Sequence, residues 1–188
     1  MWSAVEGNDG VYHVYAISAD GTGARTLASN ARGPQIVWPW VVYDSKPTTP
    51  EQQDQLARLN LVTNQTESIV GPVSVNYFAY DGTGLAWIPE SNDDILFEDP
   101  VGSAPLHISS GRFLQFVGLN NRLIGWGQDS GAFVYDRKLR VIVQLSNLSD
   151  FYPVISDQAV DWVFQPNPNA SNPYSGTVTK MLDLRDLP

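Results

Sequence analysis

Few side chains in this sequence could carry out catalysis. The chain has two histidines, His13 and His107, and no cysteine. A hydrolase of the Ser-His-Asp type needs a histidine beside an activated serine, and the sequence has no G-x-S-x-G turn. Because the two histidines fall in different predicted strands, we expect both to be structural or surface residues. Glycoside hydrolysis by a pair of carboxylates stays an open possibility, since it depends on the distance in space between the two groups, which the sequence does not give.

An acidic segment offers the oxygen ligands that Ca²⁺ prefers. It contains Glu90, Asp93, Asp94, Glu98 and Asp99. The segment does not have the ordered Asp-x-Asp-x-Asp-Gly loop with a trailing Glu that marks a calcium site. We therefore interpret these residues as charges on solvated turns, and we predict no metal and no cofactor. Asp93 and Asp94 remain candidates for contact with a partner.

The elements that must position these residues follow an internal repeat. A short apolar segment ending near a large aromatic residue recurs at spacings of 41, 44, 39 and 36 residues. The five aromatic residues are Trp2, Tyr43, Trp87, Trp126 and Trp162. Further short apolar segments surround each one, which predicts units of four short strands, A to D, with the aromatic residue near the end of B. Such repeats indicate a β-propeller, and the regular period favours core packing of the aromatic residues over a ligand platform.

Turn signals and composition agree with an all-β protein. Asp-Gly-Thr-Gly occurs at 20–23 and again at 81–84, and Asp-Gly suits tight hairpin turns. The chain of 188 residues holds 21 aromatic residues (6 Trp, 8 Tyr and 7 Phe), and only 16% of its residues are charged. Counted by unit, the pattern predicts 18 strands, because the first unit begins at strand B and the last ends after strand C.

Charge excludes several partners. The formal net charge is −9, and the 11 Lys and Arg residues are scattered along the chain. Nucleic acids and anionic membrane surfaces both need clustered positive charge, so we predict neither as a partner. No apolar run approaches the roughly 20 residues that span a bilayer. The first ten residues do not resemble a signal peptide and are more typical of the interior of a longer chain.

Two long polar segments could carry a binding surface. They run from Ser45 to Gln55 and from Gln165 to Gly176, and both are predicted B–C connections, which a propeller places on one face. Trp38 and Trp40 flank the start of strand B before the first loop, and Tyr174 lies within the second. Loops on a rigid scaffold often hold binding residues. We therefore expect the B–C face to bind a protein or peptide partner.

The segments YDGTGLAWIPESNDDILFEDP and YAISADGTGARTLAS resemble repeats of the TolB-like β-propeller family. The resemblance covers nearly the whole chain as a pattern, although Trp38-Pro39-Trp40 replaces the Asp-Gly turn in the second unit. It implies six blades, whereas about five are visible here. Their approximate limits are 1–33, 34–72, 73–111, 112–150 and 151–188. An incomplete ring would expose apolar blade faces, so we expect the remaining blades of a longer chain, or an oligomer, to cover them.

The leading interpretation is a single propeller domain that serves as a non-catalytic interaction or structural module, in a protein located outside the cytoplasm. One alternative is the access-controlling propeller of a serine peptidase of the prolyl oligopeptidase or dipeptidyl peptidase type. Another is a carbohydrate-active propeller. Three Asn-x-Ser/Thr sequences, at Asn64, Asn147 and Asn169, would be glycan acceptors only in a secreted eukaryotic protein.

Overall fold

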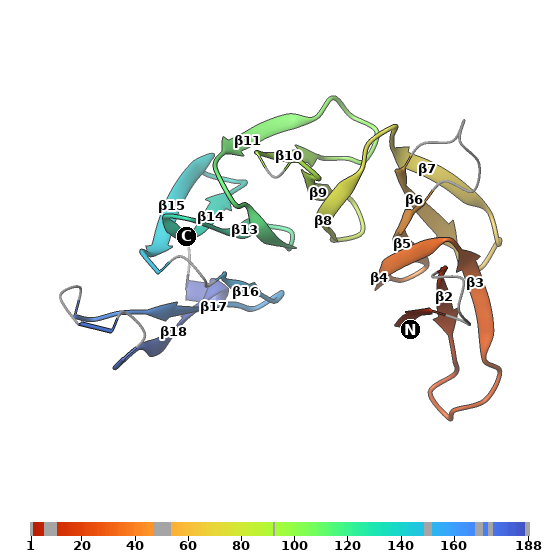
Figure 1. Cartoon of the computed structure of the whole chain (residues 1–188), viewed down its shortest axis with the longest axis horizontal. Helices are drawn as coiled ribbons and strands as arrows, with labels where there is room; N and C mark the ends of the chain where they lie inside the picture. The colour runs from red at the N-terminus through yellow and green to blue at the C-terminus, as the bar shows by residue number, and fades with distance from the viewer. Residues whose placement is uncertain are drawn as a thin grey trace. The chain divides into compact units, whose positions relative to one another are not determined.

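The computed structural model describes residues 2–5, 11–46, 54–91, 93–148, 152–167, 171–172 and 175–186. Over these residues the chain forms 18 strands and one short 3₁₀ turn, Leu184–Asp186. All the strand pairs are antiparallel, and each sheet is built from one continuous segment of chain (Figure 1). The predicted all-β class and the predicted 18 strands are confirmed.

The chain divides into two compact units, Met1–Val75 and Asn76–Pro188. The first unit contains two sheets, with strand orders β1-β2-β3 and β4-β5-β6-β7. The strands are β1 (Trp2–Val5), β2 (Tyr12–Ala16), β3 (Arg25–Ser29), β4 (Ala31–Val37), β5 (Trp40–Ser45), β6 (Gln55–Asn60) and β7 (Thr66–Val70). The two sheets pack together around a buried cluster that includes Val14, Val41, Tyr43 and Leu59.

The second unit contains three sheets, with strand orders β11-β10-β9-β8, β12-β13-β14-β15 and β16-β17-β18. Eight of its strands are β8 (Val75–Tyr80), β9 (Leu85–Pro89), β10 (Asp94–Glu98), β11 (Leu106–Ser110), β12 (Gln115–Leu119), β13 (Leu123–Gln128), β14 (Gly131–Asp136) and β15 (Val141–Ser146). The last sheet consists of β16 (Val154–Ile155), β17 (Ala159–Phe164) and β18 (Val178–Asp183).

Burial is described for four of the five repeated aromatic residues, since the side chain of Trp2 lies outside the described part of the chain, and these four lie in the core as the regular spacing predicts. Tyr43, Trp87 and Trp126 are buried and Trp162 is half-buried. Each is on the second strand of its sheet, and β9 and β13 are almost wholly buried on both faces because neighbouring strands and sheets enclose them. A buried cluster joins the first two sheets of the second unit and includes Trp126, Phe97 and Ile88.

Close packing between sheets also depends on a glycine. Gly125 lies in β13, and a Cβ atom placed there would come within 2.6 Å of Ile155 Cδ1 and 2.7 Å of Pro153 Cγ. The absence of a side chain therefore lets β16 approach β13 directly. No helix in the described part of the chain is long and apolar enough to cross a membrane.

We predict that Gly131→Ala strongly destabilises the β14–β15 sheet. Gly131 has a φ of 132°, and an added Cβ would lie 1.8 Å from the Ser146 carbonyl oxygen. Backbone strain alone costs about 1–3 kcal/mol, and the clash adds to this loss. Urea unfolding measures the change.

Gly102→Ala is the matched control. Gly102 also has a positive φ, of 89°, but its Cβ would meet open space. The free energy of unfolding of Gly102→Ala should fall only by the strain cost of about 1–2 kcal/mol. Equal losses for the two variants would contradict the tight contact at Gly131.

Candidate functional site

One cluster in the second unit contains the three residue types of a hydrolase triad. His107 Nε2 lies 2.7 Å from Asp94 Oδ1 and 3.1 Å from Ser110 Oγ, and Ser110 Oγ donates to Asp94 Oδ1 at 3.0 Å. A catalytic triad needs the carboxylate on one imidazole nitrogen and the serine on the other. Here both groups meet the same nitrogen, and the side chains are exposed on β10 and β11. The cluster is therefore a surface hydrogen-bond network.

Asp94 is stabilised as a carboxylate in this network. The hydrogen bonds from His107 and then from Ser110 lower the pKa of Asp94 below its usual value. The other histidine, His13, lies on β2 with Nδ1 3.2 Å from Ser29 Oγ. The structure thus separates the two histidines between the two units, as their positions in different predicted strands imply.

The acidic segment does not gather around a common centre. Glu98 is buried and accepts a hydrogen bond from the Gly102 N–H at 2.7 Å, whereas Asp99 binds Arg137. Asp93 is exposed in the loop before β10. Within the described ranges, no group of three or more His, Cys, Asp or Glu side chains is arranged to hold a metal ion.

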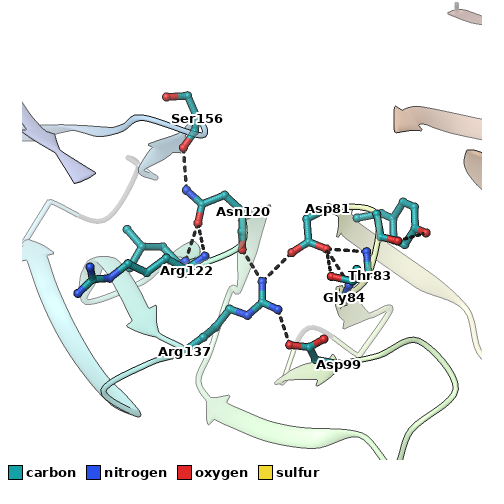
Figure 2. Close-up of polar contacts among 11 residues, drawn as sticks. Asp81, Thr83, Gly84, Asp99, Asn120, Arg122, Arg137 and Ser156 are labelled. Carbon is teal, nitrogen blue, oxygen red and sulfur yellow. Dashed lines mark hydrogen bonds and ion pairs between the residues drawn. The ribbon is translucent and has the colours of Figure 1, made fainter. Parts of the chain in front are cut away.

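A polar network lies at the A–B end of the three sheets of the second unit (Figure 2). Asp81, Asn120 and Ser156 each begin the turn between the first and second strands of their sheet. Asp81 Oδ1 accepts from the Thr83 and Gly84 N–H groups at 2.9 and 2.7 Å. Asn120 Oδ1 and Ser156 Oγ accept from their own turns in the same way.

These three turn residues occupy equivalent positions in the repeat. Each precedes the repeated tryptophan of its sheet by six residues. Asn120 also donates through Nδ2 to the Ser156 carbonyl oxygen at 2.7 Å, which joins the second sheet of this unit to the third (Figure 2). The side chain that closes a hairpin therefore also ties neighbouring sheets together.

Arg137 makes the corresponding link to the first sheet of the unit. Its Nη1 donates to Asp81 Oδ2 at 2.6 Å and to the Asn120 carbonyl oxygen at 2.5 Å, and its Nη2 binds the Asp99 carboxylate (Figure 2). The guanidinium also lies 4.8 Å from the centre of the Phe97 ring. Because Arg137 is 11% exposed and bound on several sides, it acts as a structural bridge.

The network controls the ionisation of Asp81. Burial alone would raise its pKa, but the N–H groups of Gly84 and Thr83, together with Arg137, more than offset burial and hold the pKa of Asp81 below its usual value. Two pockets flank the network, with volumes of about 340 and 360 Å³. Their charged side chains include Arg122, which pairs with Asp136, and Arg137.

The predicted binding residues of the first unit lie at a turn. Trp38 and Pro39 form the two-residue connection between β4 and β5, and Trp38 is 72% exposed. The Pro39 carbonyl oxygen accepts a hydrogen bond of 2.9 Å from Leu61 N–H, so this turn is joined to the turn after β6. Trp40 is half-buried, and the Arg58 guanidinium lies 4.2 Å from the centre of its ring.

The strand register corrects one part of the sequence interpretation. Trp40 pairs with Asn60, whereas Ser45 at the other end of β5 pairs with Gln55. Trp38 and Trp40 therefore lie at the opposite end of the sheet from the 45–55 loop, and they do not share its face. Sequence distance was misleading here, because a strand of six residues carries the chain from one end of a sheet to the other.

The remaining candidates are only partly described. Tyr174 and most of the 45–55 loop lie outside the described residues. Of the three possible glycan acceptors, Asn64 and Asn147 are exposed, and Asn169 is also outside the described residues. Sequence reasoning missed Arg137. The turn residues of its network could have been found, because a polar residue stands six positions before Trp87, Trp126 and Trp162.

Comparison with known proteins is consistent with this geometry. No protein-family model and no curated protein matches the chain. Among solved structures, TolB from Acinetobacter baumannii is 16% identical with a TM-score of 0.65, covering 93% of this chain and 47% of its own. The β-propeller domain of the Trilobed protease from Pyrococcus furiosus is 10% identical with a TM-score of 0.64, covering 99% of this chain and 69% of its own.

A third similar structure is the N-terminal domain of Nup159. It is 12% identical with a TM-score of 0.51, covering 95% of this chain and 53% of its own. These similarities, together with the repeated antiparallel sheets, show that the chain has a β-propeller fold. The chain spans about half the length of TolB. At these identities the comparisons define the fold, and function has to be argued from the surface.

We predict that Asp81→Asn lowers the free energy of unfolding at neutral pH by about 1.5–3 kcal/mol, the range for hydrogen bonds to charged groups. The amide can still accept from the turn, as Asn120 does, but it loses the charge that pairs with Arg137. Because the folded-state pKa of Asp81 is lowered, its contribution is complete above the ordinary value of 3.8 and is lost as the pH falls below it.

Urea unfolding at neutral pH and at about pH 3 tests this sign. The difference in free energy of unfolding between the wild type and Asp81→Asn should be smaller at the lower pH. Asp157→Asn, at an exposed turn position, serves as the control and should change stability little at either pH. A difference that widened on acidification would show that the Asp81 charge does not stabilise the fold.

Proposed function

We propose that this chain is part of a TolB-like propeller that binds a protein or peptide partner without catalysing a reaction. The observation that carries the proposal is the exposed apolar surface around Trp38. Ile36, Trp38 and Val62 have exposed fractions of 53, 72 and 66%. They occupy β4 and the two turns at one end of the β4–β7 sheet, which we call the Trp38 surface.

The Trp38 surface has the composition of an interaction anchor. Tryptophan is enriched among the few residues that dominate binding energy, because it buries a large rigid area on contact. A large apolar ring that is exposed to water is unfavourable for the isolated protein. Covering the ring with a partner removes its surface from water and so favours binding. An apolar cluster at a turn is better explained by contact with another molecule than by packing within the chain.

Rigid support favours the same function. The hydrogen bond from Leu61 N–H to the Pro39 carbonyl oxygen fixes the two turns relative to each other. Asn60 Oδ1 accepts from the Val62 and Thr63 N–H groups at 2.9 and 3.1 Å, which orders the second turn. A preformed surface loses less conformational entropy when it binds.

Charged groups border the Trp38 surface. Arg58 lies over Trp40 and forms an ion pair with Glu67, so the polar edge is anchored to the same sheet. An apolar centre with a charged rim is the usual arrangement of protein interfaces. The expected role of the B–C loops stays a prediction, because most of residues 45–55 and 165–176 lies outside the described ranges.

The alternative function is a propeller that controls access to a separate peptidase domain. The similarity to the propeller domain of the Trilobed protease, over 99% of this chain, motivates this alternative. It requires a hydrolase domain elsewhere in a longer protein. Identification of a G-x-S-x-G turn in adjoining sequence of the natural gene would favour it.

A peptide selection tests the interaction function. We predict that a random library of displayed dodecapeptides yields peptides that bind the wild type and bind Trp38→Ala at least about tenfold more weakly, a loss typical of an interface anchor. Isothermal calorimetry measures the dissociation constants. Thermal unfolding should show little change in Trp38→Ala, because the side chain is largely exposed.

Leu139→Ala provides the control, because Leu139 is also exposed, at 56%, but lies in the second unit. It should bind the selected peptides as the wild type does. Selected peptides that bound Trp38→Ala as tightly as the wild type would contradict the assignment of the Trp38 surface, and so would a selection that enriched no peptide.

A further inference from the structure

Three aromatic side chains from successive sheets of the second unit form a stack. Tyr77 belongs to β8, Phe116 belongs to β12, and Tyr152 comes two residues before β16. The centre of the Phe116 ring lies 5.0 Å from that of Tyr77 and 3.9 Å from that of Tyr152, with the latter pair stacked at 25°. Phe116 and Tyr152 are each 40% exposed. We call these three residues the aromatic stack.

The aromatic stack lies at the end of the sheets opposite the polar network. Tyr77 and Phe116 are near the beginnings of their strands, whereas Asp81 and Asn120 follow the ends of the same strands. The stack is therefore on the side of the B–C loops. It is independent of the Trp38 surface, which lies in the first unit.

The backbone at this position is strained. Phe116 has a φ of 48°, and Phe113 in the preceding link has a φ of 56°. Positive φ is uncommon for a bulky side chain because Cβ approaches the backbone. The pairing of β12 with β13 is also irregular between Gln115 and Gly118. Strain of this kind persists only where the surrounding structure enforces it, and such positions are enriched at functional sites.

Burial does not compensate for this strain. Phe113 is 68% exposed, and Phe116 keeps 40% of its surface in solvent. A phenylalanine that stabilised the fold alone would be expected to bury its ring in the core. The local conformation instead keeps both phenylalanine rings at the surface, with Phe116 stacked on Tyr152.

Acidic residues lie on the loops that hydrogen-bond to the link between β11 and β12, which contains Phe113. Gly111 N–H donates to the Asp93 carbonyl oxygen at 3.0 Å, and Asp129 N–H donates to the Arg112 carbonyl oxygen at 3.4 Å. The side chains of Asp93 and Asp129 are exposed. Arg112 on the same link is also exposed, so these loops carry two carboxylates against one guanidinium, and together with the protein net charge of −9 this balance favours a cationic ligand.

We propose that the aromatic stack, with Phe113, Asp93 and Asp129, binds an extended segment of a partner protein that carries arginine or lysine. A guanidinium or ammonium group is attracted to the face of an aromatic ring, and arginine also stacks on it. The neighbouring carboxylates supply the opposite charge, and the rings supply apolar contact for the stem of the basic side chain. The aromatic stack and the Trp38 surface are then separate binding surfaces.

Blocked hexapeptides with alternating residues provide the probes. One contains arginine and alanine, and the other replaces arginine with citrulline, which keeps the shape and removes the charge. Calorimetry at physiological ionic strength should show that the arginine peptide binds wild-type protein at least about tenfold more tightly than the citrulline peptide. Comparable binding of the two peptides, or no binding of the arginine peptide, would overturn the proposal.

Phe116→Gly separates ring contact from general attraction to an acidic protein. It removes the ring, leaves the net charge unchanged and suits positive φ, so the fold should be retained. Binding of the arginine peptide should fall at least about fivefold, and Tyr152→Leu should give a similar loss. Leu106→Ala, at an exposed position on β11, should bind normally.

Unchanged binding in both Phe116→Gly and Tyr152→Leu would overturn the proposal, since the attraction would then be unspecific. Thermal unfolding of each variant shows whether a loss of binding reflects a loss of fold. Maltohexaose, tested on the wild type, provides a neutral comparison. Binding of the saccharide in place of the arginine peptide would also overturn the assignment to a cationic segment. Normal peptide binding by Trp38→Ala would distinguish this site from the Trp38 surface.

Discussion

Burial of one large aromatic side chain in the second strand of a sheet is the contact on which the rest of this structure depends. Trp87 and Trp126 are both buried, and Trp126 packs in a cluster with residues of β9, β10 and β11 from the neighbouring sheet. Six residues earlier, Asp81 and Asn120 close the turns that lead into these strands. The repeat therefore couples a local turn to the packing between sheets. Arg137 completes this coupling, because it binds groups from two sheets at once.

This arrangement leaves the ends of the sheets for the binding that we propose. The strands and their buried faces are committed to packing, and the Ser-His-Asp cluster has both partners on one imidazole nitrogen. The exposed apolar residues include aromatic side chains at sheet ends, with Trp38 at a turn and Phe116 beside Tyr152. Fixed aromatic side chains suit recognition of another molecule better than they suit acid–base chemistry. These residues are the basis of the proposed interaction function.

The sequence predicted the fold better than it predicted the surface. A period near 40 residues located the buried tryptophans and the strand order, because core packing repeats in every unit. Trp38 was found as a candidate, but it was grouped with the B–C loops. It lies at the other end of the sheet, because β5 carries the chain from one end to the other between Trp40 and Ser45. Arg137 and Phe116 were missed. Their roles arise from contacts between residues distant in sequence, such as Arg137 with Asp81, and from a left-handed φ that no local pattern indicates.

Hydrogen–deuterium exchange of the intact protein, alone and saturated with a peptide that it binds, tests the central claim most directly. The account predicts that slowed exchange is confined to sheet ends, at residues 36–40 and 60–65 or at residues 111–116, while the strands around Trp87 and Trp126 exchange as in the free protein. Protection spread through those buried strands would contradict the account, because binding would then reorganise the core instead of using a preformed surface.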